Sequence, residues 1–208
     1  MPMVNSRSLD DLRPDVRANC EVFLELCREE GLNVLVTQTL RDDEYQASLY
    51  AQGRTKPGSK VTNSKVTTFH GKGLAFDFCK NRKGHEFDDD RFFERCGEIA
   101  KQIGFSWGGD WRSFPDRPHI QWDAAGEYSG NDVRGGKLPP EMEEYMTQEK
   151  FNEMMDNYLA EQRKKNVAPW AEKDWSAAKA AGITDGSAPQ GLATRQEVIA
   201  IVKRAVKG

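Results

Sequence analysis

Residues 67–78 of the chain read TTFHGKGLAFDF. The second half of this stretch, GLAFDF, alternates as a β-strand does and places Asp77 between two phenylalanines. Burying a carboxylate there is costly unless a charge or hydrogen bonds compensate it. A metal ion held by Asp77 and His70 would supply that compensation. The alternative is a histidine in a turn and a strand aspartate bonded to backbone, and this stretch by itself favours the alternative.

A second stretch, residues 114–122, reads FPDRPHIQW. Together with the first stretch, it favours a metal site over the alternative. It offers His119 before an apolar strand, and Asp116 in the pattern Asp-x-x-His. With His70 and Asp77, His119 completes a set of three nitrogen and oxygen ligands, and a catalytic zinc keeps a fourth position open for water. The spare carboxylate of Asp116 could then handle the proton of that water. A set of two histidines and one aspartate also suits divalent metals other than zinc.

Two other aspartates are alternative candidates for the general base, and a third histidine serves as a control for the metal ligands. Asp110, in the phrase WGGDW, is a rival to Asp116 as the base, and Asp123 is a less favoured one. His85 lies in the charged segment NRKGHEF, so we interpret it as a solvated histidine.

The composition excludes several classes of protein. The net charge of -3 over 208 residues gives no general attraction to nucleic acid. No apolar run approaches the length of a membrane span. The first residues lack the basic start and apolar core of a standard secretory signal. We therefore expect a protein that is made and kept in the cytoplasm until something releases it. The four cysteines form no C-x-x-C pair, so half-buried free thiols are expected.

The hydrophobic pattern predicts an α+β domain over residues 1–140. Helices are expected from Pro14 to Gly31, from Asp42 to about Gly53, and over residues 90–104. Strands are expected in NVLVTQTL, GLAFDF, FSWGG and HIQW, with a polar loop over residues 55–68. Because no βαβ rhythm is present, the strands should form a small antiparallel sheet flanked by helices.

The rest of the chain has a different character. Residues 141–166 are predicted to be a helical linker, with one charged helix from Glu141 to Lys165 and a rough apolar stripe typical of packing. Residues 167–208 are predicted to be a small module of two helices. A stop at Gly182 separates them, and the capping box Thr194-x-x-Glu197 begins the second.

Several motifs resemble one family of enzymes. The segment from Thr68 to Asp77 is similar to the Ser-x-His-x-x-Gly-x-Ala-x-Asp signature of zinc DD-peptidases, with threonine in place of serine. The phrase WGGDW followed by Asp-x-x-His resembles the L-alanyl-D-glutamate endopeptidase branch, which includes many phage endolysins and some bacterial cell-wall hydrolases. The segment LRDDEYQASLYAQGRT matches the arginine-containing segment of the family. The resemblance covers about residues 10–125.

The resemblance implies a Hedgehog/DD-peptidase-like fold and a role for each matching residue. His70, Asp77 and His119 would bind one Zn²⁺ per catalytic domain. Asp116 would act as general base and then as acid, and Arg41 would stabilise the oxyanion or hold the substrate carbonyl. The residues expected to bind substrate are Gln46, Thr68, Trp107, Asp110 and Trp111.

Two of these roles have alternatives. Arg41 could instead form an ion pair with one of the acids that follow it, Asp42, Asp43 or Glu44. Trp107 and Trp111 could wall a substrate groove, but tryptophans beside glycines equally often pack.

The function implied is a zinc endopeptidase of bacterial peptidoglycan, specifically an endolysin that cuts the L-Ala–D-Glu bond and is released by a holin. A D-Ala-D-Ala carboxypeptidase of the same fold is one alternative. A non-catalytic wall-binding protein with a structural metal is another. The tail is similar to a single surface-layer-homology segment, which suggests a cell-wall-binding module at residues 167–208.

Overall fold

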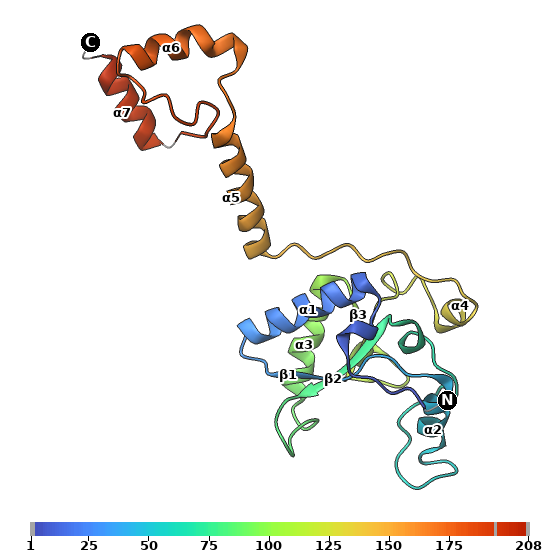
Figure 1. Cartoon of the computed structure of the whole chain (residues 1–208). Helices are drawn as coiled ribbons and strands as arrows, with labels where there is room; N and C mark the ends of the chain where they lie inside the picture. Colours follow the sequence, from blue (N-terminus) through green and yellow to red (C-terminus); the bar gives the residue numbers. More distant parts are fainter. Residues whose placement is uncertain (1–2, 194, 207–208) are drawn as a thin grey trace. The chain divides into compact units, whose positions relative to one another are not determined.

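The computed structural model describes residues 3–193 and 195–206. The chain divides into two compact units, Met1–Tyr145 and Met146–Gly208, with the sheet in the first (Figure 1).

The sheet has four strands in the order β1-β2-β4-β3, and every neighbouring pair is antiparallel. The strands are β1 (Val34–Gln38), β2 (Ala75–Lys80), β3 (Ser106–Trp107) and β4 (His119–Gln121). This confirms the predicted α+β class with its antiparallel sheet. The register places Asp77 of β2 directly opposite His119 of β4.

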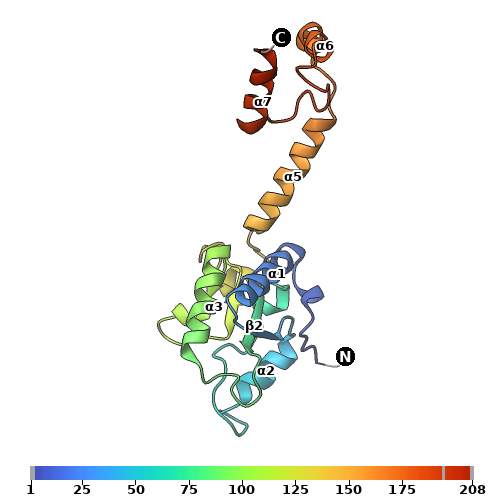
Figure 2. The same cartoon turned by 90° about the vertical axis from the view of Figure 1, so that its left-hand side faces the viewer.

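Helices surround the sheet within the first unit (Figures 1 and 2). They are α1 (Pro14–Glu29), α2 (Asp43–Ala51), α3 (Asp90–Ile103) and α4 (Gly130–Arg134), with the short 3-10 turns η1 (Leu9–Asp11), η2 (His70–Lys72) and η3 (Gly108–Asp110). The predicted starts and stops are confirmed. Asp42 caps α2 by accepting a hydrogen bond from Tyr45 N, and α3 ends at Gly104, whose φ is 109°.

The core lies between β2 and the helices α1 and α3. Phe23 of α1 has its ring centroid 5.5 Å from that of Phe76 and 5.7 Å from that of Phe78, and Phe93 of α3 lies 5.4 Å from Phe78. Because side chains alternate along a strand, Phe76 and Phe78 share the core face and Asp77 points to the opposite face. The pleat of β2 thus separates the core from the site.

The cysteines are free, as expected, but they are fully buried rather than half-buried. Cys27 of α1 and Cys96 of α3 have sulfur atoms 4.0 Å apart inside the core.

One prediction about helix boundaries is wrong. The helix expected from Glu141 begins only at Gln148, so that α5 spans Gln148–Lys164 with Thr147 as its N-cap. Residues 139–145 instead form an extended segment, here called the strap, which lies along α1.

The strap is extended because side chains of α1 bind the backbone groups that a helix would use. Asp15 accepts a hydrogen bond from Met142 N (2.6 Å). Asn19 accepts one from Tyr145 N (2.8 Å) and donates to Glu143 O (3.0 Å). Met142 is buried in the core of the first unit.

The second unit contains α5, the 3-10 turn η4 (Pro169–Ala171), α6 (Glu172–Ala180) and α7 (Arg195–Ala205). Gly182 follows α6 with φ of 67°, in agreement with the predicted stop. None of the residues described in this unit is buried, and the stripe Phe151, Met154, Met155 and Tyr158 on α5 is exposed. The predicted capping box involves Thr194, which lies outside the described residues. No helix in the described part of the chain is long and apolar enough to cross a membrane.

Candidate metal centre

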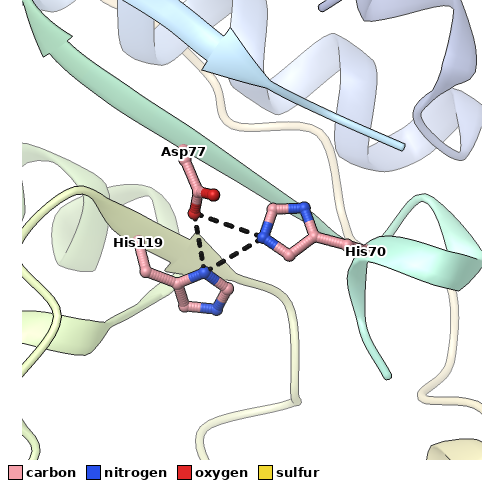
Figure 3. A group of neighbouring side chains, drawn as sticks. All are labelled: His70, Asp77 and His119. Atoms are coloured by element: carbon pink, nitrogen blue, oxygen red, sulfur yellow. Dashed lines mark hydrogen bonds and ion pairs between the residues drawn. The ribbon is translucent and has the colours of Figure 1, made fainter. Parts of the chain in front are cut away.

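Three side chains from three elements converge on one point (Figure 3). His70 Nε2 lies 3.2 Å from Asp77 Oδ1, His119 Nδ1 lies 2.9 Å from the same oxygen, and the two nitrogens are 3.2 Å apart. One possible ligand atom from each residue lies within 4.8 Å of the others. The structure therefore brings the three predicted ligands together.

Local backbone geometry explains this convergence. Asp77 and His119 are cross-strand partners, so their side chains leave the sheet side by side. His70 begins η2, which Gly73 ends with φ of 65°. A Cβ on Gly73 would lie 2.7 Å from Asp11 O, so only glycine allows η2 to pack this closely against the start of α1.

The charges of the cluster favour a cation. Burial opposes ionisation of Asp77, but the two histidines outweigh it and hold its pKa well below the usual range. Burial would lower the pKa of His119, yet its bond to Asp77 and the charge of Asp77 raise it. Burial lowers the pKa of His70, with partial compensation from Asp77. Two imidazole nitrogens and a carboxylate oxygen, buried and mutually close, form a donor set that fits a zinc-like divalent ion.

Asp116 lies within electrostatic reach of this cluster. Burial raises its pKa; the charge of Asp77 adds to that effect, while His119 and Arg41 oppose it. A turn holds the residue in place, because Asp116 N donates to Gly108 O (2.9 Å) and His119 N donates to Asp116 O (3.1 Å). A Cβ on Gly108 would lie 2.4 Å from Asp116 O, so this turn also depends on a glycine.

Arg41 enters the site from the segment between β1 and α2. Its Nη1 donates to Gln38 Oε1 and lies 3.3 Å from Asp77 Oδ2. Two of the three acids that follow it have other partners, since Asp42 caps α2 and Asp43 accepts from Thr67 N (2.7 Å). Within the described residues the ion pair of Arg41 is therefore the one with Asp77.

The two tryptophans of WGGDW take different positions. Trp111 is 37% exposed, and its ring centroid lies 5.1 Å from that of His119. Trp107 is buried, covers Gly97 of α3 and donates from Nε1 to Arg117 O (2.8 Å). Trp111 thus borders the candidate metal ligand His119, whereas Trp107 packs in the core.

Other residues expected near the substrate have structural partners. Asp110 is exposed and pairs with Lys101 (2.8 Å). Gln46 is buried and donates from Nε2 to Thr62 Oγ1 (3.1 Å) and Ser64 O (2.8 Å), which fastens the polar loop.

Arg41, which pairs with Asp77, also lines a pocket of about 310 Å³ together with Asp42 and Asp43. Thr68 and Gly71, on either side of His70 in sequence, line it together with the basic side chains of Lys72 and Arg134. Arg41 therefore connects this pocket to the candidate metal ligand Asp77.

His85, the control residue, and Asp123, the less favoured rival for the base, each have a structural partner. His85 is exposed, and its Nδ1 lies 2.6 Å from Asp88 Oδ2. Asp123 is buried, and its carboxylate accepts hydrogen bonds from Ser106 Oγ (2.6 Å) and Gln121 Nε2 (2.7 Å).

Gln121 is a residue of the site that the sequence interpretation missed. Its Oε1 lies 3.0 Å from His119 Nε2, and its Nε2 donates to Asp123. The spacing His-x-Gln-x-Asp at positions 119, 121 and 123 could have revealed it, because every second residue of a strand shares a face.

Known proteins resemble this chain in the same region. A family model described as D-alanyl-D-alanine carboxypeptidase matches residues 62–122. The peptidoglycan L-alanyl-D-glutamate endopeptidase CwlK of Bacillus subtilis is 35% identical over 122 residues, which cover 53% of this chain and 73% of that protein. The chain belongs to the M15 peptidase family.

Two further proteins are similar to parts of this M15 peptidase. The L-alanyl-D-glutamate peptidase of Listeria phage A118 is 31% identical over 128 residues, which cover 58% of this chain and 42% of the phage protein. Among solved structures, the Serratia marcescens L-Ala D-Glu endopeptidase ChiX is 18% identical with a TM-score of 0.45, covering 61% of this chain and 93% of that chain.

Proposed function

We propose that this M15 peptidase is a zinc-dependent peptidoglycan endopeptidase that hydrolyses the bond between L-alanine and D-glutamate in the stem peptide. The observation that carries the proposal is the convergence of His70, Asp77 and His119 on one point, with Asp116 and Arg41 within electrostatic reach. The names of the two curated relatives support the choice of bond.

His70 Nε2, His119 Nδ1 and Asp77 would hold the zinc ion. When bound, zinc lowers the pKa of a coordinated water to about 7 and polarises a carbonyl group.

The surrounding side chains supply the rest of the chemistry. Asp116 accepts the proton of the attacking water and later delivers it to the leaving amine, a role that its partly buried carboxylate suits. Arg41 is permanently charged and stabilises the oxygen that gains negative charge. Trp111, whose ring centroid lies 5.1 Å from that of His119, would form one wall of the site.

The pocket beside Arg41 supports an acidic peptide as substrate. Lys72 and Arg134 add positive charge to its lining. Asp42 and Asp43 also line the pocket, but their carboxylates accept hydrogen bonds from backbone N–H groups, Asp42 from Val4 and Tyr45, and Asp43 from Thr67. A D-glutamyl peptide, which carries carboxylates, matches this arrangement of charge.

Identification of the products tests the proposal. Purified stem peptide is incubated with the zinc-loaded chain, and the new termini are identified by mass spectrometry. We expect a new carboxyl terminus at L-alanine and a new amino terminus at D-glutamate. Release of a terminal D-alanine would instead support the D-Ala-D-Ala carboxypeptidase function that the description of the family model favours. A folded, zinc-bound chain that leaves the peptide intact would support the non-catalytic alternative.

The phage relative supports an endolysin setting, in which a holin would release the enzyme to the cell wall. Expression in bacteria with and without a holin tests this part of the proposal. Lysis that needs the holin is expected, and equal lysis without it would contradict a need for holin.

A further inference from the structure

We propose that Gln121 and Asp123 are positioning residues that select which nitrogen His119 presents to the metal. The inference rests on the proposed metal site and concerns the two residues behind it. His119, Gln121 and Asp123 are all buried, at 6%, 7% and 6% exposure, so bulk water cannot replace the contacts among them.

Asp123 determines which group donates and which accepts in the two hydrogen bonds that join Asp123 to Gln121 and Gln121 to His119. An ionised carboxylate only accepts hydrogen bonds. Its Oδ1 accepts from Ser106 Oγ (2.6 Å) and Gly126 N (2.9 Å), and its Oδ2 lies 2.7 Å from Gln121 Nε2. The NH₂ group of Gln121 must therefore face Asp123, and its carbonyl oxygen must face His119.

That oxygen decides the tautomer of His119. Gln121 Oε1 lies 3.0 Å from His119 Nε2 and can only accept, so Nε2 carries hydrogen. A neutral imidazole has hydrogen on one nitrogen alone, and the lone pair of His119 is then on Nδ1. Nδ1 is the nitrogen that lies 2.9 Å from Asp77 and 3.2 Å from His70.

Without Gln121, the imidazole hydrogen of His119 could move from Nε2 to Nδ1. Asp77 Oδ1 attracts a hydrogen to Nδ1 of His119, and a hydrogen there would block the lone pair that the metal needs. Gln121 opposes this by stabilising the hydrogen on Nε2.

His70 shows the same principle with a different acceptor. Its Nδ1 lies 2.8 Å from the backbone oxygen of Thr39, which leaves the Nε2 lone pair toward the metal. The two histidines thus present different nitrogens, and an acceptor behind each one explains the difference.

Zinc affinity of the full-length chain tests the proposal, measured by competition with a chromogenic chelator. Gln121→Met keeps the length of the side chain but removes the acceptor, and we expect a loss of about 10–100-fold in affinity. The matched control is Asn19→Leu, which also removes a buried amide, but one that binds the strap. Its zinc affinity should equal that of the wild type, with folding of each variant checked by circular dichroism.

A double variant that exchanges the amide and carboxylate of Gln121 and Asp123 distinguishes a role in positioning His119 from a role in packing alone. In the double variant Gln121→Glu with Asp123→Asn, the new carboxylate accepts from His119 Nε2 and from the new amide, so every donor keeps an acceptor and the net charge is unchanged. We expect this pair to restore zinc affinity, whereas Asp123→Asn alone should weaken it. Wild-type affinity in Gln121→Met, or no recovery in the swapped pair, would overturn the proposal.

A second readout separates this inference from the proposed function. Nitrogen-15 NMR of the metal-free chain at alkaline pH reports which nitrogen of His119 carries hydrogen. We expect hydrogen on Nε2 in the wild type and a shift toward Nδ1 in Gln121→Met. Hydrogen on Nδ1 in the wild type would refute the inference even if zinc binds. Failure of the wild type to bind zinc would refute the metal site, while the NMR result would still decide the role of Gln121.

Discussion

The orientation of each candidate metal ligand depends on a group that contacts it or lies beside it in the chain. Asp77 points away from the core because Phe76 and Phe78 occupy the core face of β2. His70 is oriented by the backbone oxygen of Thr39, and His119 by Gln121. The chemical types of the ligands were predictable from two short stretches, which also contain Phe76, Phe78 and Gln121, whereas the Thr39 oxygen behind His70 comes from elsewhere in the chain.

The first prediction at this scale concerns metal binding. His70→Ala should abolish stoichiometric zinc binding because a three-ligand site loses one ligand. The control is His85→Ala, which removes an exposed histidine paired with Asp88 and should leave the zinc content unchanged. Elemental analysis after dialysis measures both. An unchanged zinc content in His70→Ala would exclude that residue from the site.

The second prediction separates binding from catalysis. Asp116→Ala should keep zinc but lose about 10²–10⁴-fold in the rate of peptide cleavage, the usual contribution of a general base. Asp110→Ala should have a smaller effect, because its carboxylate faces Lys101. Steady-state kinetics with soluble stem peptide give both values. If the two results were reversed, Asp110 would become the candidate base.

At the scale of elements, local signals predicted most boundaries and failed at the strap. The faces of α1 and α3 follow from a period of 3.6 residues, the start of α1 from Pro14 at its first position, and the end of α3 from Gly104. The sequence after Pro140 has the composition of a helix, but Asp15 and Asn19 compete for its backbone groups. Local propensity cannot anticipate partners that lie more than one hundred residues away.

The strap predicts a dependence of stability on acid pH. Burial opposes ionisation of Asp15, but bonds from Arg13 and Met142 N lower its pKa overall. A carboxyl group whose pKa is lowered in the folded state stabilises the fold above its unfolded pKa of about 3.9, and that contribution is lost as the pH falls through the folded pKa.

Asp15→Asn should therefore lower the free energy of unfolding at neutral pH by about 1.5–3 kcal/mol, the usual value for hydrogen bonds to a charged group. It should also reduce the fall in stability on the acid side. Urea unfolding at neutral pH and at acid pH measures both effects. The control Asp10→Asn affects an exposed pair with Arg17 and should stay within about 0.5 kcal/mol of the wild type. Equal acid dependence in Asp15→Asn and the wild type would contradict the lowered pKa of Asp15 in the folded state.

At the scale of the whole molecule, the hydrophobic core and the candidate site belong to the first unit. The buried core residues run from Leu12 to Met142 in sequence. The residues described in the second unit include none that is buried. The resemblance of the tail to a wall-binding segment stays a prediction.

Two truncations test this division. A chain of residues 1–145 should fold, bind zinc and cleave soluble stem peptide as the full chain does. A chain of residues 1–138 loses the strap with Met142, and should be less stable by about 2–5 kcal/mol, as for removal of a buried methionine. Thermal unfolding and peptide cleavage measure the difference. Failure of residues 1–145 to fold would refute the division.

Intact cell walls provide the test of the second unit. If it binds wall, residues 1–145 should lose activity on walls but keep it on soluble peptide. Equal loss on both substrates would instead indicate damage to the first unit.

By itself, the sequence determined the helix faces, the strands, the antiparallel class and the chemical identity of the ligands. These follow from periodicity and from residue types within short stretches, which are local properties. Only the tertiary structure decided that Asp77 stands opposite His119, that Trp107 packs while Trp111 borders the site, and that the backbone oxygen of Thr39 lies behind His70. Each of these depends on strand register or on contacts between segments far apart in the chain. Such contacts form only when the core has packed, so no local pattern encodes them.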